Sequence, residues 1–329
     1  MKQGQVKFYL HNISKLVFLL LAVSVISFAL VTASPIDPVD AFLESATVTE
    51  EQHAKIAAYW GLDKSPVERY LTWGGHLLQG DLGESITYHQ PVKDVLSECF
   101  KASIALMGTA WIMSGFIGLA LGILAGVKKD SWTDKIIKTI CLGLASTPVF
   151  WVGLLVLVVF AIELQWFPIG LAAPIGKLAK DVTIWERLHH LALPAFTLSI
   201  THVASIALHT RQKLIDVLES DYVLFAKARG ETMQQIIMRH GLRNIALPAI
   251  TLQCASVSEL FGGSVLAEKV FSYPGLGNAA TVAGLHGDAP LLLGIALFSA
   301  LFVFVGNLAA NIIYGIVDPQ IREGGTYGE

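Results

Sequence analysis

The chain has few charged residues and few cysteines for its length of 329 residues. Only 15% of the residues are charged, whereas 53% are hydrophobic. A water-soluble domain does not need that balance, so the composition argues against one. The 3 cysteines, Cys99, Cys141 and Cys254, are odd in number and far apart, which argues against a disulfide framework and a thiolate metal site. We expect them to be packing residues.

Basic tracts and catalytic motifs are missing as well. The formal net charge is −3 and no run of Lys and Arg occurs, so nothing indicates a nucleic-acid partner. The motifs GxSxG, HExxH and CxxC are absent. The segment 170–178, GLAAPIGKL, has one residue too many between its glycines for a phosphate-binding loop, and Leu178 stands where Ser or Thr would bind magnesium. We therefore expect a chain that has no catalytic residues and binds no cofactor.

Long apolar runs dominate the rest of the sequence. About 20 apolar residues cross the roughly 30 Å of hydrocarbon in a bilayer. Runs of about this length lie near Leu16–Ala33, Ala102–Val127, Ile136–Ile162, Leu191–Leu208, Ile245–Leu266 and Leu291–Val317. They predict an all-α integral membrane protein with six transmembrane helices.

Lysine and arginine residues mark one side of the membrane. Most of the 23 basic residues fall in the N-terminal tail, in the loops 128–138 and 211–243, or at Arg322. Short loops with this excess face the cytoplasm, so both termini are predicted to be cytoplasmic. The first run could instead be a cleaved signal peptide. We favour a span, because the run exceeds the roughly 7–15 residues of a signal core and cleavage would leave the two ends on opposite sides.

We expect three parts along the chain. They are residues 1–33 (cytoplasmic tail and first span), 34–101 (a small extracytoplasmic cap) and 102–329 (a core of five spans with a cytoplasmic loop at 210–244). Two helices are predicted in the cap, one over 49–60 that ends at Gly61 and one over 66–78 that is closed by Gly80. The cap is too small for an independent catalytic domain.

Short motifs spread over nearly the whole chain carry a family resemblance. They include Gly61–Pro66, Gly80–Ser85, Thr147–Trp151, Leu193–Ala195, Asp221–Val223, Ala226–Gly230, Arg239–Asn244, Phe271–Gly277 and Asp318–Arg322. Each is weak alone, but their shared order is specific. In this order they resemble the first permease subunit of the peptide/nickel class of ABC importers. The resemblance implies the type I permease fold in a bacterial cytoplasmic membrane. It also implies a homologous second permease, two ATPase subunits that bind ATP and magnesium, and an extracytoplasmic solute-binding protein.

The same resemblance gives the cytoplasmic loop 210–244 a role. ABC permeases carry a coupling helix here that sits in a groove of the ATPase subunit. The residues assigned to this contact are Tyr222, Val223, Phe225, Ala226, Lys227, Arg229, Gly230 and Arg239. Aromatic and apolar anchors with a charged rim suit an interface, although Leu224 stands where the family has an acidic residue. The alternative is that these basic residues only follow the charge rule for cytoplasmic loops and that the loop binds nothing.

Ionisable and strongly polar residues inside the spans predict a translocation pathway, because hydrocarbon is a costly environment for them. These residues are Glu259 in the fifth span, His202, Ser205 and His209 on one face of the fourth, and Asn307 with Asn311 in the sixth. The alternative for the histidines and asparagines is that they bond neighbouring helices. In the second span Gly118, Gly122 and Gly126 predict a close helix contact, either with the second permease or within this subunit.

Glu259 also bears on the substrate. The acidic residue here, and the arginine of Ala226–Gly230, resemble nickel-type permeases. Carboxylates and imidazoles suit a divalent metal, free or bound to a metallophore, and His286 and Asp288 join Glu259 as candidate ligands. A di- or oligopeptide importer is the alternative, because a carboxylate would equally attract the ammonium group of a peptide. A non-transporting membrane scaffold is the competing class.

Overall fold

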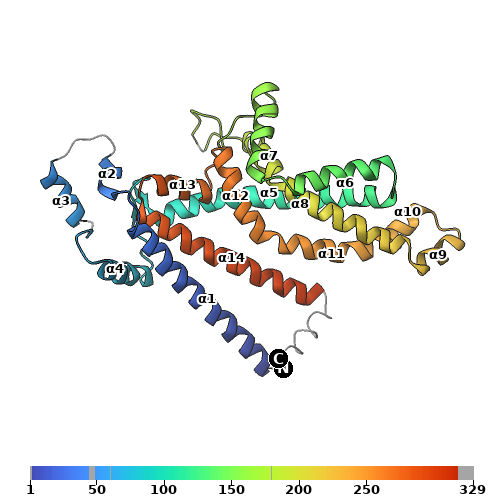
Figure 1. Ribbon diagram of the computed structural model, residues 1–329, viewed down its shortest axis with the longest axis horizontal. Helices are drawn as coiled ribbons and strands as arrows, with labels where there is room; N and C mark the ends of the chain where they lie inside the picture. Colours follow the sequence, from blue (N-terminus) through green and yellow to red (C-terminus); the bar gives the residue numbers. More distant parts are fainter. Residues whose placement is uncertain (1, 44–48, 60, 179, 318–329) are drawn as a thin grey trace. The chain divides into compact units, whose positions relative to one another are not determined.

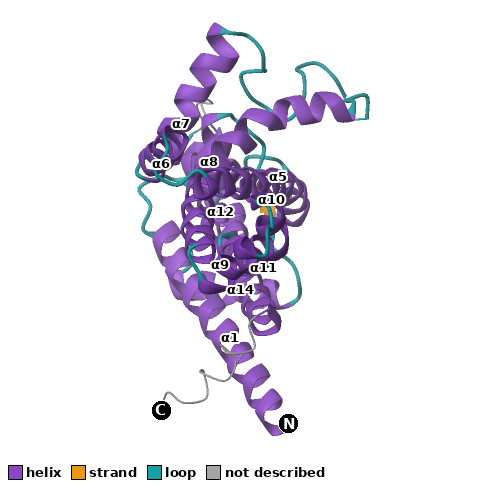
Figure 2. Cartoon of the chain, turned by 90° about the vertical axis from the view of Figure 1, so that its right-hand side faces the viewer, coloured by secondary structure: helices purple, strands orange, loops and turns teal. Residues whose placement is uncertain are grey.

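The computed structural model describes residues 2–43, 49–59, 61–178 and 180–317, and most of these are helical (Figures 1 and 2). The chain divides into two units, each of which is described by itself. Unit 1 comprises Met1–Ala102 and Pro274–Val305, and unit 2 comprises Ser103–Tyr273 and Gly306–Glu329. Two long helices, α5 (Val92–Val127) and α14 (Ala289–Val317), contribute residues to both units.

Unit 1 consists of a long first helix, short helices and a small hairpin. Its elements, besides the first part of α5 and most of α14, are α1 (Lys2–Thr32), α2 (Pro38–Leu43), α3 (Glu50–Tyr59), α4 (Pro66–Leu78), β1 (Glu84–Ser85), β2 (Gln90–Pro91) and α13 (Leu276–Leu285). The strands are antiparallel, with Ser85 opposite Gln90. The hairpin departs from the all-α prediction, because two-residue strands are too short to show an alternating pattern in the sequence.

The two helices predicted after the first span are present. In α3 the Thr49 hydroxyl accepts from the Gln52 amide, and Gly61 follows with a φ of +69°. Trp60, at the predicted end of this helix, lies outside the described residues. α4 begins with a capping box between Ser65 and Glu68, and a left-handed Gly80 follows its end. Side-chain caps and glycine stops therefore set these boundaries, as the sequence indicates.

Unit 2 is built around helix α8, which packs against α6, α7, α11 and α12. Its elements, besides parts of α5 and α14, are α6 (Trp132–Ala145), α7 (Val149–Val156), the π-helical η1 (Leu157–Glu163), α8 (Ile184–Leu218), α9 (Asp221–Ala228), α10 (Met233–Ile236), the π-helical η2 (Ile237–Gly241), α11 (Leu242–Ala255) and α12 (Val257–Val270). One apolar cluster joins α7, α8 and Phe271, and a second joins α6 to α8 through Cys141. All three cysteines are buried thiols, as expected for packing residues.

Between four and six spans fit the described residues. Four helices are long and apolar enough to cross a membrane, namely Leu10–Thr32, Val92–Val127, Ile184–Leu218 and Ala289–Ile313. The predicted third run bends by 112° between α6 and α7, and the fifth bends by 52° between α11 and α12. Pro148 starts α7 without an N–H group to continue α6, which accounts for the sharper bend. The count of six stays a prediction.

The glycine series in α5 makes a close contact within this subunit. A Cβ atom on Gly118 would lie 2.8 Å from Cβ of Ile206, and one on Gly122 would lie 2.7 Å from the carbonyl oxygen of Ala207. Both neighbours belong to α8. Small residues at this spacing let the two backbones approach, so internal packing is the role that the structure gives to the series.

Candidate translocation and coupling sites

Three helices of unit 2 bring polar side chains together. A carboxylate oxygen of Glu259 on α12 lies 3.8 Å from Nδ1 of His202 on α8. Beside it, Ser258 donates a 2.6 Å hydrogen bond to Oδ1 of Asn307 on α14. We call Glu259, His202, Ser258 and Asn307 the polar group. It contains three of the residues that the sequence assigns to a pathway, and Ser258 is an addition.

Glu259 has a largely exposed side chain, in contrast to its partner His202. Its side chain is 78% exposed, whereas that of His202 is 9% exposed. A charged group that faces hydrocarbon costs on the order of 3 kcal/mol or more. A carboxylate this open therefore requires water, a passing solute or another subunit beside it. It can accept hydrogen bonds or attract a positive charge from any of these.

The other residues predicted for the pathway lie on the same helices but outside the polar group. Ser205 and His209 are exposed on α8, where Nδ1 of His209 lies 3.1 Å from the carbonyl oxygen of Ser205. Asn311 is exposed on α14, one turn beyond Asn307. Within the described part of the chain, no hydrogen bond or ion pair links Ser205, His209 or Asn311 to Glu259.

Glu268 is a second acidic residue of α12, and sequence reasoning missed it. Its side chain is fully buried and accepts a 2.7 Å hydrogen bond from the Ser103 hydroxyl on α5. The residue follows the apolar run 245–266 by two positions, so a search confined to the run passes over it. Its burial and bonding are typical of a structural carboxylate.

The segment predicted as a cytoplasmic loop folds into a hairpin of α9, α10 and η2 with an apolar centre of its own. Val223 and Ala226 of α9 pack with Val217 and Ile236. Val223 is completely buried, so it supports the hairpin from inside rather than offering contact surface. Ala226 is likewise buried. The small and β-branched residues predicted as contacts thus position the outer face of the hairpin.

That outer face carries large apolar side chains. Phe225 is 71% exposed and Leu224 65% exposed, next to the exposed Lys227. Tyr222 is partly turned inward, with its hydroxyl 3.4 Å from Nδ2 of Asn244 on α11. Exposed aromatic and aliphatic residues at the tip of a polar hairpin are the anchors that protein interfaces use. Leu224, which departs from the family pattern, is part of this apolar tip.

Glu231 forms ion pairs with several basic residues of the hairpin, a role that was not predicted from the sequence. Arg229 Nη2 lies 2.8 Å from Oε1 of Glu231, and Arg239 Nη1 lies 3.8 Å from the same oxygen. Nε2 of His240 lies 3.6 Å from the other carboxylate oxygen. The predicted basic rim is thus partly neutralised within the hairpin, because Glu231 links the end of α9 to η2.

Gly230 closes α9 in a left-handed conformation with a φ of +83°. Its N–H donates to the carbonyl of Lys227, and the N–H of Glu231 donates to that of Ala226. These two bonds form a Schellman motif. A side chain at Gly230 would meet nothing within 4 Å, so the backbone angle and not crowding limits the choice of residue here.

A buried ion pair attaches α6 to the end of α8 from which the hairpin continues. The guanidinium of Arg211 donates to both carboxylate oxygens of Asp134, at 2.5 and 2.6 Å. Lys129, just before α6, forms an ion pair with Glu219 at the end of α8, and this carboxylate raises the pKa of Lys129. Both pairs join residues far apart in the sequence, so neither could be read from it.

The candidate metal ligands of the sequence analysis are divided between the two units. Asp288 in unit 1 is completely buried, and its carboxylate accepts hydrogen bonds from the Ser85 hydroxyl at 2.5 Å and from the Thr87 amide at 3.0 Å. The amide of Leu291 donates to its other oxygen, which caps α14. These bonds give Asp288 a structural role. His286 is partly buried at the end of α13.

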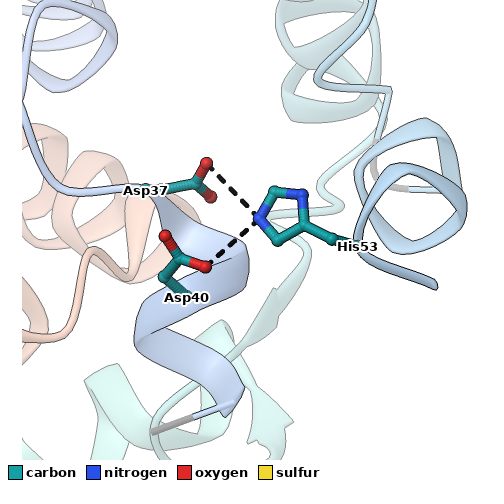
Figure 3. A group of neighbouring side chains, drawn as sticks. All are labelled: Asp37, Asp40 and His53. Carbon is teal, nitrogen blue, oxygen red and sulfur yellow. Dashed lines mark ion pairs between the residues drawn. The ribbon is translucent and has the colours of Figure 1, made fainter. Parts of the chain in front are cut away.

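Another group of potential ligands lies in the segment that follows α1 (Figure 3). Nε2 of His53 on α3 lies 3.6 Å from a carboxylate oxygen of Asp37 and 3.3 Å from one of Asp40, both near the start of α2. Asp40 is exposed, and Asp37 also accepts the amide N–H of Val39. The arrangement is that of an ion pair between two short helices and includes none of the predicted metal ligands.

Apolar helices with polar groups inside them and a polar hairpin at one end are the arrangement of a membrane transport subunit. Residues 118–323 match the family described as "Binding-protein-dependent transport system inner membrane component". The chain therefore belongs to this family of ABC importer permeases, and it is an integral membrane protein.

Similar proteins match along most of their length. The oligopeptide transport system permease protein AppB of Bacillus subtilis is 35% identical over 92% of this chain and 95% of its own. The di/tripeptide permease DppB of Pseudomonas aeruginosa is 32% identical over 91% of this chain and 94% of its own. The dipeptide permease DppB of Escherichia coli K12 is 30% identical over 96% and 98%. These names favour the peptide alternative of the sequence analysis over the nickel interpretation.

Proposed function

We propose that this chain is one permease subunit of an ATP-driven importer of di- or oligopeptides. The assignment of a peptide substrate is supported by the similarity, over nine-tenths of the chain, to permeases named for peptides. A homologous second permease would complete the pathway. Two ATPase subunits would bind ATP and magnesium, and an extracytoplasmic binding protein would deliver the peptide. Both termini would face the cytoplasm, with residues 34–101 on the other side.

The polar group supplies chemistry that a peptide can use on its way through. Glu259 offers an exposed carboxylate to the ammonium end of a peptide. Ser258 and Asn307 add hydroxyl and amide groups that can exchange hydrogen bonds with peptide units. With Ser205, His209 and Asn311 further along α8 and α14, these side chains would line the pathway.

Coupling would run through helix α8. The hairpin would dock in the ATPase by its exposed Phe225 and Leu224, while Lys227, Arg229 and Arg239 form the rim. α8 is continuous from His202 to Leu218, three positions before α9 begins, a length of about 24 Å at 1.5 Å per residue. A shift of the hairpin would therefore move the polar group, because the helix between them is rigid.

Uptake assays test the substrate directly. Cells with and without this chain are given a labelled dipeptide, or labelled nickel with and without histidine as chelator. We expect the cells without the chain to lose dipeptide uptake and to keep nickel uptake. Loss of nickel uptake alone would move the function to metals, and no loss of either would favour a scaffold.

Glu259→Gln forms a second arm of this experiment, because it keeps the size of the side chain and removes its charge. We expect dipeptide uptake to fall by about tenfold, the loss of one charge-assisted contact of about 1.4 kcal/mol. Ser205→Ala on α8 removes one uncharged hydroxyl group from the same proposed pathway, and its expected effect is smaller. Uptake at the wild-type rate in Glu259→Gln would remove the carboxylate from the pathway.

A second experiment tests coupling at Gly230. Gly230→Val places a β-branched residue at a φ of +83°, a strain of about 1–3 kcal/mol that distorts the end of α9. We expect the transporter to assemble and hydrolyse ATP while peptide uptake falls at least about tenfold. Gly230→Asn is the control, since asparagine tolerates this conformation. Unchanged uptake in Gly230→Val would refute the assignment of the hairpin as the coupling element.

A further inference from the structure

Helix α4 carries an open apolar stripe. At about 100° per residue, Val67, Leu71 and Leu78 fall on one side of the helix. They are 68%, 66% and 91% exposed. Gly74 and Gly75 lie between Leu71 and Leu78, and a Cβ atom on either would meet nothing within 4 Å. Three large apolar side chains are therefore exposed along one side of this helix.

A second face of α4 holds the helix against α1. The Tyr70 hydroxyl is 2.8 Å from Oγ of Ser24, and the ring of Tyr70 meets Phe28 edge-on at 5.2 Å between centroids. Trp73 lies 6.1 Å from the same Phe28 ring, and the Arg69 guanidinium lies 6.0 Å from its centroid. One hydrogen bond and three ring contacts thus fix the level of α4 along α1.

The third face is polar and lies away from the stripe. Glu68 closes the capping box with Ser65, and Thr72 and His76 line a cavity of about 580 Å³ in unit 1. The helix is therefore amphipathic in the manner of interfacial helices, with an apolar side, a polar side and aromatic residues between them.

The contacts with α1 give α4 a depth in the bilayer. The candidate span of α1 is Leu10–Thr32, and only 6% of its most apolar window is buried within the chain, so most of its apolar surface is left open to lipid. At 1.5 Å per residue, Ser24 and Phe28 lie about 12 Å and 6 Å before Thr32. Since 23 residues rise about 35 Å and the hydrocarbon is about 30 Å thick, these contacts hold α4 at the hydrocarbon boundary.

We propose that α4 is an interfacial helix whose stripe, Val67, Leu71 and Leu78, is buried among acyl chains of the leaflet that holds the C-terminal end of α1. α1 is apolar and largely exposed at the level where α4 is attached, so the stripe continues an apolar surface that a bilayer would cover. Tyr70 and Trp73 are residue types enriched at that level. The inference rests on α1 as a span and not on the transported substrate.

Spin labels in the assembled transporter, reconstituted in liposomes, test this placement. Leu71→Cys and Leu78→Cys carry the label on the stripe, and Thr72→Cys carries it on the polar face as the matched control. The native cysteines are buried, so a thiol-specific spin label reacts first with the introduced residue when the protein is labelled in detergent before reconstitution. Collisions are measured with oxygen, which dissolves in the acyl region, and with a chromium chelate that stays in water.

We expect the labels at Leu71 and Leu78 to collide with the chromium chelate roughly tenfold less often than the label at Thr72, and to remain accessible to oxygen. Equal collisions with the chelate at all three positions would overturn the proposal, because the stripe would then face water. Protection of Leu71 and Leu78 from both reagents would also overturn it, because a protein partner would then cover the stripe.

Discussion

Replacing Arg211 with alanine is expected to destabilise the protein by about 3–5 kcal/mol. The cost arises because Asp134, whose side chain is 3% exposed, keeps its charge but loses both hydrogen bonds from the guanidinium. Thermal unfolding of the purified chain in detergent measures the loss. We also expect less assembled transporter, since this pair holds α6 to the end of α8 that leads into the hairpin of α9, α10 and η2.

A double variant distinguishes the effect of breaking the ion pair from the effect of removing a large side chain. Asp134→Leu combined with Arg211→Met replaces both charges with apolar groups, and buried pairs replaced in this way often lose little stability. We therefore expect the double variant to unfold closer to the wild type than Arg211→Ala does. If Arg211→Ala unfolds at the wild-type temperature, the ion pair does not stabilise the contact of α6 with α8.

The second large effect is expected at Gly122, where even a methyl group has no room. A Cβ atom there would lie 2.6 Å from Cβ of Thr210 and 2.7 Å from the carbonyl oxygen of Ala207. The oxygen is part of the α8 backbone and cannot rotate away, so Gly122→Ala must push α5 and α8 apart. We expect a loss of about 3 kcal/mol, the upper end for overpacking, as a lower unfolding temperature in detergent.

Gly108→Ala is the matched control on the same helix. Nothing lies within 4 Å of a Cβ atom at Gly108, and alanine is the better helix former by about 1 kcal/mol. This variant should therefore unfold at or above the wild-type temperature. Equal stability of the Gly122→Ala and Gly108→Ala variants would show that a Cβ atom at Gly122 has more room beside α8 than the 2.7 Å to the Ala207 carbonyl oxygen.

Local sequence signals, such as apolar runs and helix-ending glycines, predicted the helices well. They did not predict how the helices bend or which helices pack together. Apolar length gave the helical segments, and Gly61 and Gly80 marked the ends of α3 and α4. Hydropathy reports how apolar a segment is but not the direction of its helix axis. Two runs that were predicted as single spans are therefore bent in the structure. Pro148 was a visible signal for one bend. The other bend lies at Ser256, and the nearest proline and glycine of the run, Pro248 and Gly262, are eight and six positions away, so no signal marked the bend itself.

The candidate sites divide in the same way. Glu259 and His202 could be chosen in advance because ionisable residues in apolar runs are rare, and the structure brings the two together. Asp134 and Glu231 stand in polar segments where charge is ordinary. Their importance comes from partners that only the fold supplies. The spacing of Gly122 and its neighbours indicated close packing but could not name the partner helix.

The Asp288 carboxylate has a consequence for how the chain is made. It is bonded to Ser85 and Thr87, which are 203 and 201 positions earlier in the sequence. Ser85 leaves the ribosome long before Asp288 is synthesised. The β1–β2 turn therefore lacks the carboxylate that accepts its hydrogen bonds until the intervening helices have been made. The segment after α1 therefore completes its structure only when α14 enters the membrane, and a chain truncated before α13 would leave it unfinished.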